Sequence, residues 1–377
     1  MHNTVAEVFP PGEYLREELD ARGWTQEEFA DIIGRSYKQV NELLGGKAAL
    51  TAPMAAAIAA ALGTSAELWL NLESAFRLSL AEPVSHDVAR RGRLRAEFPV
   101  REMQKRGWIP KLEKPENIDQ LERDVYDFFA IAESDGRSPY ASAAKRADYT
   151  IALTRTQEAI VLRVRQLASR LRPAPYSEEA LRRCIEQLKD LRADANAVRH
   201  VPDLLALAGV RFVVCEPFAG SKLDGICTWL DAHSPVIGMT LRLDRIDNFW
   251  FVLRHEIEHV LRRDGLVNNE PGAVVDEDLS NAASDGVPAA EIAANIAATE
   301  FCLPTDAMQT FIDRVGPLYS KSNVRECARA NGVHPGLVVG QLQRRLSRWD
   351  LFRPMLVKVR ESLTSVALTD GYGRIVA

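Results

Sequence analysis

The first 80 residues alternate short amphipathic segments with glycine, serine or threonine, a pattern that predicts five short helices. The segments share apolar residues at helical spacing. The last four begin at a serine or threonine cap, and the first four end at glycine. The predicted helices span residues 13–21, 25–33, 37–44, 51–62 and 65–78. We therefore expect a compact all-helical domain over residues 1–80.

The second predicted helix begins with a recognisable capping box. Thr25 starts the string Thr-Gln-Glu-Glu, so its hydroxyl can accept the amide of Glu28 while the Glu28 carboxylate reaches back. The helical period then places Phe29, Ile32 and Ile33 on the inward face.

The second and third helices are separated by only a glycine and an arginine, which is typical of a helix-turn-helix. The second helix of such a pair can lie in the major groove with its N-terminal side chains at base edges. Because Val40, Leu43 and Leu44 take the apolar positions, the polar side chains form the exposed face. The side chains that we expect to contact bases or phosphates are Arg35, Ser36, Tyr37, Lys38, Gln39, Asn41 and Lys47.

Three strings in this region resemble the HigA-type antitoxins of the Cro/CI helix-turn-helix class. They are Phe-Pro-Pro-Gly-Glu-Tyr-Leu from residue 9, Trp-Thr-Gln-Glu-Glu-Phe-Ala from residue 24, and Ala-Leu-Gly-Thr-Ser-Ala-Glu-Leu-Trp-Leu from residue 61. The resemblance covers residues 9–80. It implies binding to operator DNA, usually as a homodimer, and it suggests a small ribonuclease toxin as a protein partner.

The charge of this region limits how it can bind DNA. Residues 1–80 hold six basic and eleven acidic side chains, a net charge of −5. DNA affinity must therefore depend on the local cluster of Arg35, Lys38 and Lys47. The alternative is a helical bundle that binds another protein and has lost its contact with DNA.

Residues 81–200 are predicted to form a helical connector region. Residues 88–111 hold eight basic and two acidic side chains, a net charge of +6. We interpret them as a solvated, partly helical connector; the alternative is that they extend the DNA footprint onto phosphates. Further helices are expected over residues 121–131 and 149–171, and from Ser177.

The pattern changes at Gly209, where β-branched and apolar runs replace the helical period. The runs cover residues 210–215, 226–230 and 235–241, with glycine and proline breaks between them. They predict a small antiparallel sheet. The expected fold is thus mainly α with a small β-sheet (α+β), with a C-terminal domain over residues 201–350 and a C-terminal extension over residues 351–377.

An apolar helix from Phe249 carries His255, Glu256 and His259, the HExxH motif. Residues i and i+4 share one helical face, so both imidazoles can bind one metal ion. Glu256 lies next to a ligand, where it can take a proton from a water that the metal acidifies, and this predicts attack on a carbonyl. The alternative is two histidines packed by chance along a buried helix.

A catalytic site of this type needs a third protein ligand. The metzincin continuation is excluded, because position 262 is arginine and position 265 is glycine. A carboxylate from a second helix is the remaining common solution. Glu291 begins such a helix; the alternative is that it is only a first-turn acid favoured by the helix dipole. Its competitors in the intervening acidic loop are Glu270, Asp276, Glu277 and Asp278.

These residues resemble the ImmA/IrrE-type metallopeptidases, which pair HExxH with a helix of the form Glu-x-x-Ala-Asn-x-x-Ala-x-x-x-x-Leu-Pro. The resemblance spans residues 200–345 and implies a HExxH zincin-like domain. It places the metal on His255, His259 and Glu291, with Glu256 as the base. Asn295, one turn after Glu291, is then expected to hydrogen-bond a ligand carboxylate. Zinc is the expected cofactor, with manganese as the alternative.

The composition is consistent with a regulator of this kind. The 377 residues are 46% hydrophobic and 26% charged with a net charge of −5, which excludes a protein that coats nucleic acid through charge alone. We find no apolar stretch of 18 residues and no signal peptide. With five widely spaced cysteines as well, we expect a cytoplasmic protein with no membrane partner.

The leading hypothesis is a regulator with two functions: an operator-binding domain joined to a metallopeptidase that cleaves a protein substrate, either a repressor or this chain itself. The second hypothesis is a non-catalytic antitoxin or repressor whose metal domain is a sensor or scaffold. The third is a peptidase whose N-terminal bundle only recruits protein.

Overall fold

The computed structural model describes residues 8–82, 85–111, 113, 117–131, 153–267, 270–279 and 288–374. The chain divides into two compact units, residues 1–88 and residues 89–377. The residues assigned to the connector therefore lie, from residue 89 onward, in the same unit as the sheet. The predicted boundaries at residues 200 and 350 stay predictions.

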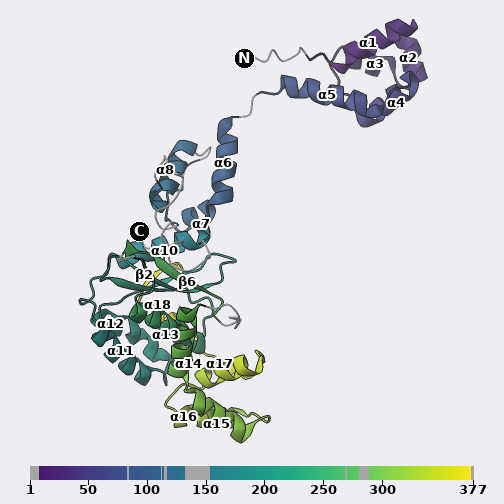
Figure 1. The fold of residues 1–377 in the computed structure, drawn as a ribbon. Helices are drawn as coiled ribbons and strands as arrows, with labels where there is room; N and C mark the ends of the chain where they lie inside the picture. Colours follow the sequence, from purple (N-terminus) through teal and green to yellow (C-terminus); the bar gives the residue numbers. More distant parts are fainter. Residues whose placement is uncertain are drawn as a thin grey trace. The chain divides into compact units, whose positions relative to one another are not determined.

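Over the described residues 8–82, the first unit contains five helices around one apolar core (Figure 1). They are α1 (Pro11–Arg22), α2 (Gln26–Ile32), α3 (Tyr37–Leu44), α4 (Ala52–Leu62) and α5 (Ala66–Leu80). The prediction of a five-helix domain is confirmed.

Side-chain caps fix where α2 and α3 begin. The capping box predicted at Thr25 is present, with the Thr25 amide donating to Glu28 Oε2 at 2.8 Å and the Glu28 amide donating to Thr25 Oγ1 at 3.2 Å. A second box joins Ser36 and Gln39 at the start of α3. The inward placement of Ile32 is wrong, because this side chain is 49% exposed at the last turn of α2.

The second unit contains a five-stranded sheet in the order β6-β2-β3-β1-β7. The strands are β1 (Arg211–Cys215), β2 (Leu223–Trp229), β3 (Pro235–Met239), β6 (Ala273–Glu277) and β7 (Leu368–Asp370), and a separate ribbon joins β4 (Leu266–Val267) to β5 (Glu270–Pro271). The antiparallel prediction is only partly right. β2 runs antiparallel to β3 and β6, whereas β1 runs parallel to β3 and β7.

Helices cover both faces of this sheet, which explains why β1, β2 and β3 are almost entirely buried. The helices of the unit are α6 (His86–Glu97), α7 (Val100–Lys105), α8 (Ile118–Phe129), α10 (Arg155–Ala168), α11 (Glu178–Leu191), α12 (Val201–Leu207), α13 (Ile246–Arg262), α14 (Ala289–Cys302), α15 (Thr305–Val315), α16 (Lys321–Ala330), α17 (Pro335–Leu346) and α18 (Arg360–Thr364). Along β1, Val213 faces the core that contains α8 and α10, and Val214 faces the core that contains α13. Residues 149–152 of a predicted helix lie outside the described residues.

The strand β7 ties the end of the described chain to the middle of the second unit. Its Asp370 is fully buried, forms an ion pair with Arg163 of α10, and accepts a hydrogen bond from the Trp108 indole at 2.9 Å. Residues predicted as a C-terminal extension therefore contribute both a strand and a buried charge.

Two further expectations concern the whole chain. Within the described part of the chain, no helix is both long and apolar enough to cross a membrane. All five cysteines are buried free thiols.

Candidate functional site

The predicted metal-binding motif lies on α13, which packs against β2 and β3 on one side and α14 on another (Figure 1). Eleven of its 17 residues are buried, because the helix lies between these elements. His255, Glu256 and His259 point from it into the interior, and none of the three has exposed surface. Three buried polar side chains on one helix require compensating partners.

Glu291 of α14 supplies one of these partners. Its carboxylate oxygens lie 3.2 Å from His255 Nε2 and 3.5 Å from His259 Nε2, and the two Nε2 atoms are 3.0 Å apart. A tetrahedral ion with bonds of about 2.0–2.1 Å would separate its ligand atoms by about 3.3 Å. The three side chains therefore have the spacing that would hold one divalent ion.

Several buried atoms of this cluster have no hydrogen-bond partner among the described residues. They are His255 Nδ1, both carboxylate oxygens of Glu256, Asp276 Oδ2 and Glu291 Oε1. Orphaned buried acceptors are costly, and a cation among them would remove much of that cost. The donor set of two imidazoles and a carboxylate suits zinc, so these residues fit a divalent metal.

The pKa values of the cluster indicate the same need for positive charge. Burial lowers the pKa of His259, but the carboxylates of Asp264 and Glu291, which lie 2.9 and 3.5 Å from its ring nitrogens, outweigh burial and raise it to about 10. Burial raises the pKa of Glu291, but the two histidines reverse this and bring the pKa well below its usual value. The negative carboxylates therefore favour positive charge at the imidazoles, either as bound protons or as a metal cation.

Asp264 orients one imidazole and was not found by sequence reasoning. It follows the end of α13, and its Oδ2 lies 2.9 Å from His259 Nδ1. A proton held on Nδ1 leaves the Nε2 lone pair free to face the cluster. The only signal in the sequence was an acid shortly after HExxH.

Glu256 lies closer to the sheet than the sequence could indicate. A Cβ built on Gly225 of β2 would stand 1.9 Å from Glu256 Oε1, so only glycine leaves room for this carboxyl. Burial raises the pKa of Glu256 well above its usual value, and the neighbouring Asp276 adds to the effect.

Of the four acids that compete with Glu291 as the third ligand, Asp276 is the one that lies in the cluster. Its carboxylate lies 3.5 Å from His255 Nε2 and 3.7 Å from His259 Nε2. The segment is a strand, β6, rather than a loop, because it pairs with β2. In this strand the side chains of Val274 and Asp276 are turned inward and buried. Glu277 is exposed, and Asp278 instead pairs with Arg242 at 3.0 Å.

Asn295 lies on α14 one turn after Glu291, and the hydrogen bond from its amide nitrogen to a ligand carboxylate stays a prediction. The Oδ1 atom of Asn295 is buried and has no hydrogen-bond partner among the described residues. Its backbone carbonyl accepts from the Thr299 hydroxyl at 2.8 Å. Its contribution to the site stays a prediction.

In the first unit, every side chain predicted to contact DNA is exposed. Arg35 lies in the turn between α2 and α3, and Lys47 lies just beyond α3. Ser36 and Gln39 are partly engaged in their capping box. Lys38 has a side chain that is 83% exposed and only a loose 3.8 Å ion pair with Glu42.

Comparison with known proteins identifies this unit. Residues 15–69 match the helix-turn-helix family. The chain is 39% identical over 84 residues to YddM of Escherichia coli, an uncharacterized HTH-type transcriptional regulator; the alignment covers 22% of this chain and 88% of that protein. The chain belongs to the helix-turn-helix family. The match lies in the N-terminal domain, which is a DNA-binding, antitoxin-like domain.

Two further proteins are similar to part of this chain. Over 79 residues the chain is 38% identical to antitoxin HigA-1 of Vibrio cholerae, covering 21% of this chain and 74% of the antitoxin. It is 27% identical to PA4674 of Pseudomonas aeruginosa, solved in complex with its operator DNA, with 22% of this chain and 90% of that chain covered and a TM-score of 0.21. The family match ends at residue 69, far before His255.

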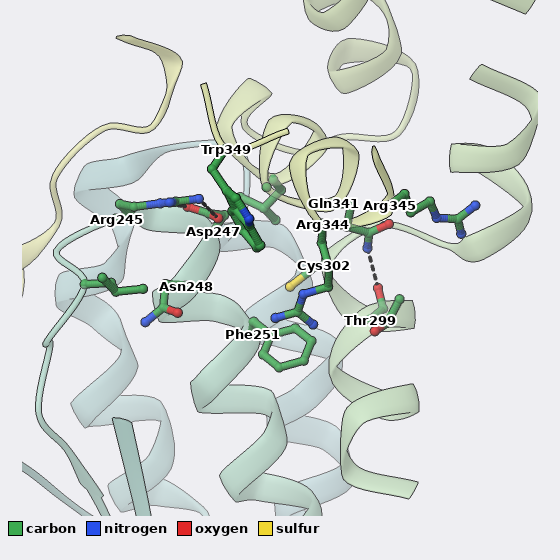
Figure 2. A pocket seen from close by; sticks show the side chains of 13 residues that line it. Arg245, Asp247, Asn248, Phe251, Thr299, Cys302, Gln341, Arg344, Arg345 and Trp349 are labelled. Atoms are coloured by element: carbon green, nitrogen blue, oxygen red, sulfur yellow. Dashed lines mark hydrogen bonds and ion pairs between the residues drawn. The ribbon is translucent and has the colours of Figure 1, made fainter. Parts of the chain in front are cut away.

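The second unit of this helix-turn-helix regulator also has a cleft beside the first half of α13 (Figure 2). The Arg344 guanidinium of α17 lies 4.2 Å from the Phe251 ring centroid, and Gln341 donates to the Thr299 carbonyl at 2.8 Å. An ion pair of 2.6 Å between Arg245 and Asp247 forms another part of the lining. No sequence motif marked this cleft.

Proposed function

We propose that the chain is a transcriptional regulator whose helix-turn-helix domain binds operator DNA and whose second unit is a metal-dependent peptidase of the ImmA/IrrE type. The single observation that supports the peptidase is the convergence of His255, His259 and Glu291 beside Glu256. We also propose a toxin protein as a partner of the N-terminal domain, as its resemblance to antitoxins implies.

Operator binding is supported by the exposed N-terminal half of α3 and its basic flanks. Lys38 and Arg35 project from the start of the second helix of the pair, where base edges and phosphates are reached. Homodimers would present two such helices to a palindromic site. Replacing Lys38 by alanine should weaken DNA binding and reduce the salt slope by about 1.

The control for this test is Arg77→Ala on α5, which removes the same charge from an ion pair with Glu73. It should leave the salt slope unchanged. An unchanged slope in Lys38→Ala itself would favour the hypothesis that the N-terminal bundle only recruits protein.

For the peptidase, His255, His259 and Glu291 would hold the ion. Zinc, or manganese as the alternative, would acidify a water and polarise the scissile carbonyl when bound. Glu256 is placed to accept the water's proton at its carboxylate and to pass it to the leaving amine, and its burial suits the second role. The protein substrate is a repressor or this chain itself.

The decisive experiment measures bound metal and the cleavage of candidate repressors by the wild type and three variants. Glu256→Gln should keep the metal and lose cleavage by about 10²-fold or more, whereas His255→Ala should lose both. Glu258→Gln is the matched control, because Glu258 is on the same helix but pairs with Arg254 at 2.9 Å. Undiminished cleavage by Glu256→Gln would reject Glu256 as the base.

A non-catalytic antitoxin or repressor is the second candidate, and the position of Asp276 favours it. The Asp276 carboxylate, as a fourth ligand group in the cluster, leaves less room for water. This candidate predicts that metal, operator and toxin bind without turnover. Loss of His255 would then change operator or toxin affinity, whereas loss of Glu256 would not.

A further inference from the structure

The side chain of Asp276 lies among the potential ligand atoms, beside both imidazoles and Glu256. Four side chains, His255, His259, Asp276 and Glu291, place ligand atoms within 4.8 Å of one another. A water deprotonated by Glu256 must lie between Glu256 and the two imidazoles. Asp276 faces both imidazoles, at 3.5 and 3.7 Å, and also neighbours Glu256.

The backbone holds Asp276 in this position from both sides. Before it, Val274 and Val275 pair in regular register with β2. Beside it, the register shifts between Leu223 and Gly225, an irregularity of the kind that re-aims side chains next to functional sites.

The extra residue at this irregularity, Asp224, secures the segment after β6. Its carboxylate accepts from the Leu279 amide at 3.1 Å and pairs with Arg242 at 2.9 Å. Arg242 in turn reaches Asp278 at 3.0 Å. Asp276 is therefore only 5% exposed and is fixed toward the cluster rather than free to turn to solvent.

We propose that Asp276 is a fourth protein ligand, so that the centre is closed while β6 is in place. The inference rests on the proposed metal site. Two carboxylates balance the charge of a divalent ion, and four protein ligands are typical of zinc sites that retain metal without turnover. Among the described residues, β6 lies at the edge of the sheet with β2 as its one neighbour, so cleavage requires this single ladder to release Asp276.

Metal affinity provides the first test, using the full chain and zinc alone in competition with a chelator. Asp276→Ala should bind zinc about 10- to 100-fold more weakly than the wild type, with Asp276→Asn in between. Glu277→Ala is the matched control, since Glu277 follows on the same strand, is exposed, and should leave zinc affinity unchanged.

Access to the metal provides the second test. In the cobalt-substituted wild type, added acetohydroxamate should leave the visible spectrum unchanged, whereas in Asp276→Ala it should bind and shift the spectrum. A cobalt-substituted wild type whose visible spectrum shifts with acetohydroxamate would overturn the inference, and this result does not depend on the folding of Asp276→Ala.

The outcomes separate the two proposals. If His255→Ala abolishes zinc binding while Asp276→Ala and Asp276→Asn bind as tightly as the wild type, the metal site stands and the fourth ligand is rejected. If the wild type binds neither zinc nor cobalt, both proposals fail. If only the Asp276 variants bind acetohydroxamate, both are supported.

Discussion

Replacing Gly225 by alanine tests how closely the sheet approaches Glu256. The new Cβ would stand 1.9 Å from Glu256 Oε1, 2.6 Å from its Cδ and 3.0 Å from its Cγ. Ordinary carbon contacts begin at about 3.5 Å, so three atoms of one side chain would have to move, the nearest by more than about 1 Å.

Neither partner can relieve this overlap cheaply. Glu256 has no exposed surface and cannot turn into solvent. Gly225 is held by pairing with Met239 on one side and Asp276 on the other. Overpacking of a well-packed core typically costs about 1–3 kcal/mol, and we expect Gly225→Ala to lie in the upper half of that range.

The assay is equilibrium urea denaturation of the full chain, followed by tryptophan fluorescence. Gly92→Ala in α6 is the matched control, because a Cβ there meets no atom within 4 Å. That substitution should stabilise the protein by about 0.5–1 kcal/mol, since alanine is the better helix former.

A double-mutant cycle identifies the cause of the destabilisation. In a Glu256→Ala background the obstructing atoms are gone, so Gly225→Ala should cost at least about 1 kcal/mol less than in the wild type. Equal costs in the two backgrounds, to within about 0.5 kcal/mol, would show that the approach of β2 to Glu256 is not what requires glycine.

Three further predictions follow from contacts described above. Asp264→Asn should weaken zinc binding about 10- to 100-fold by loosening the orientation of His259, measured by chelator competition; unchanged affinity would remove Asp264 from the site. Thr25→Ala should destabilise the helix-turn-helix domain by about 1 kcal/mol through loss of the capping box, and a thermal midpoint equal to that of the wild type would contradict this. Asp370→Ala should destabilise the second unit by about 3–5 kcal/mol in urea, because the Arg163 charge stays buried; a cost below about 1 kcal/mol would refute the importance of the pair.

The sequence predicted best those features that depend on local spacing. The capping box at Thr25 and the order of the five helices follow from residues within one or two turns of each other. HExxH likewise required only that i and i+4 share a helical face. Glu291 was found because its helix carries a recognisable pattern, although its approach to His255 depends on tertiary packing.

Features that depend on strand pairing were not predictable in the same way. The segment around Asp276 has the composition of an acidic loop, and only its pairing with β2 turns it into a strand that aims this carboxylate inward. The parallel pairing of β1 with β3 and β7 is also a long-range property. An apolar run is compatible with either direction until its neighbours are known.

The contact between Trp108 and Asp370 has a consequence for how the protein is made. These residues are 262 positions apart, so at typical synthesis rates the ribosome adds Asp370 roughly 13–50 s after Trp108. The helix-turn-helix domain, with its own core, is complete long before then. A ribosome that stops before residue 370 would therefore release a folded N-terminal domain attached to a second unit that lacks its closing strand.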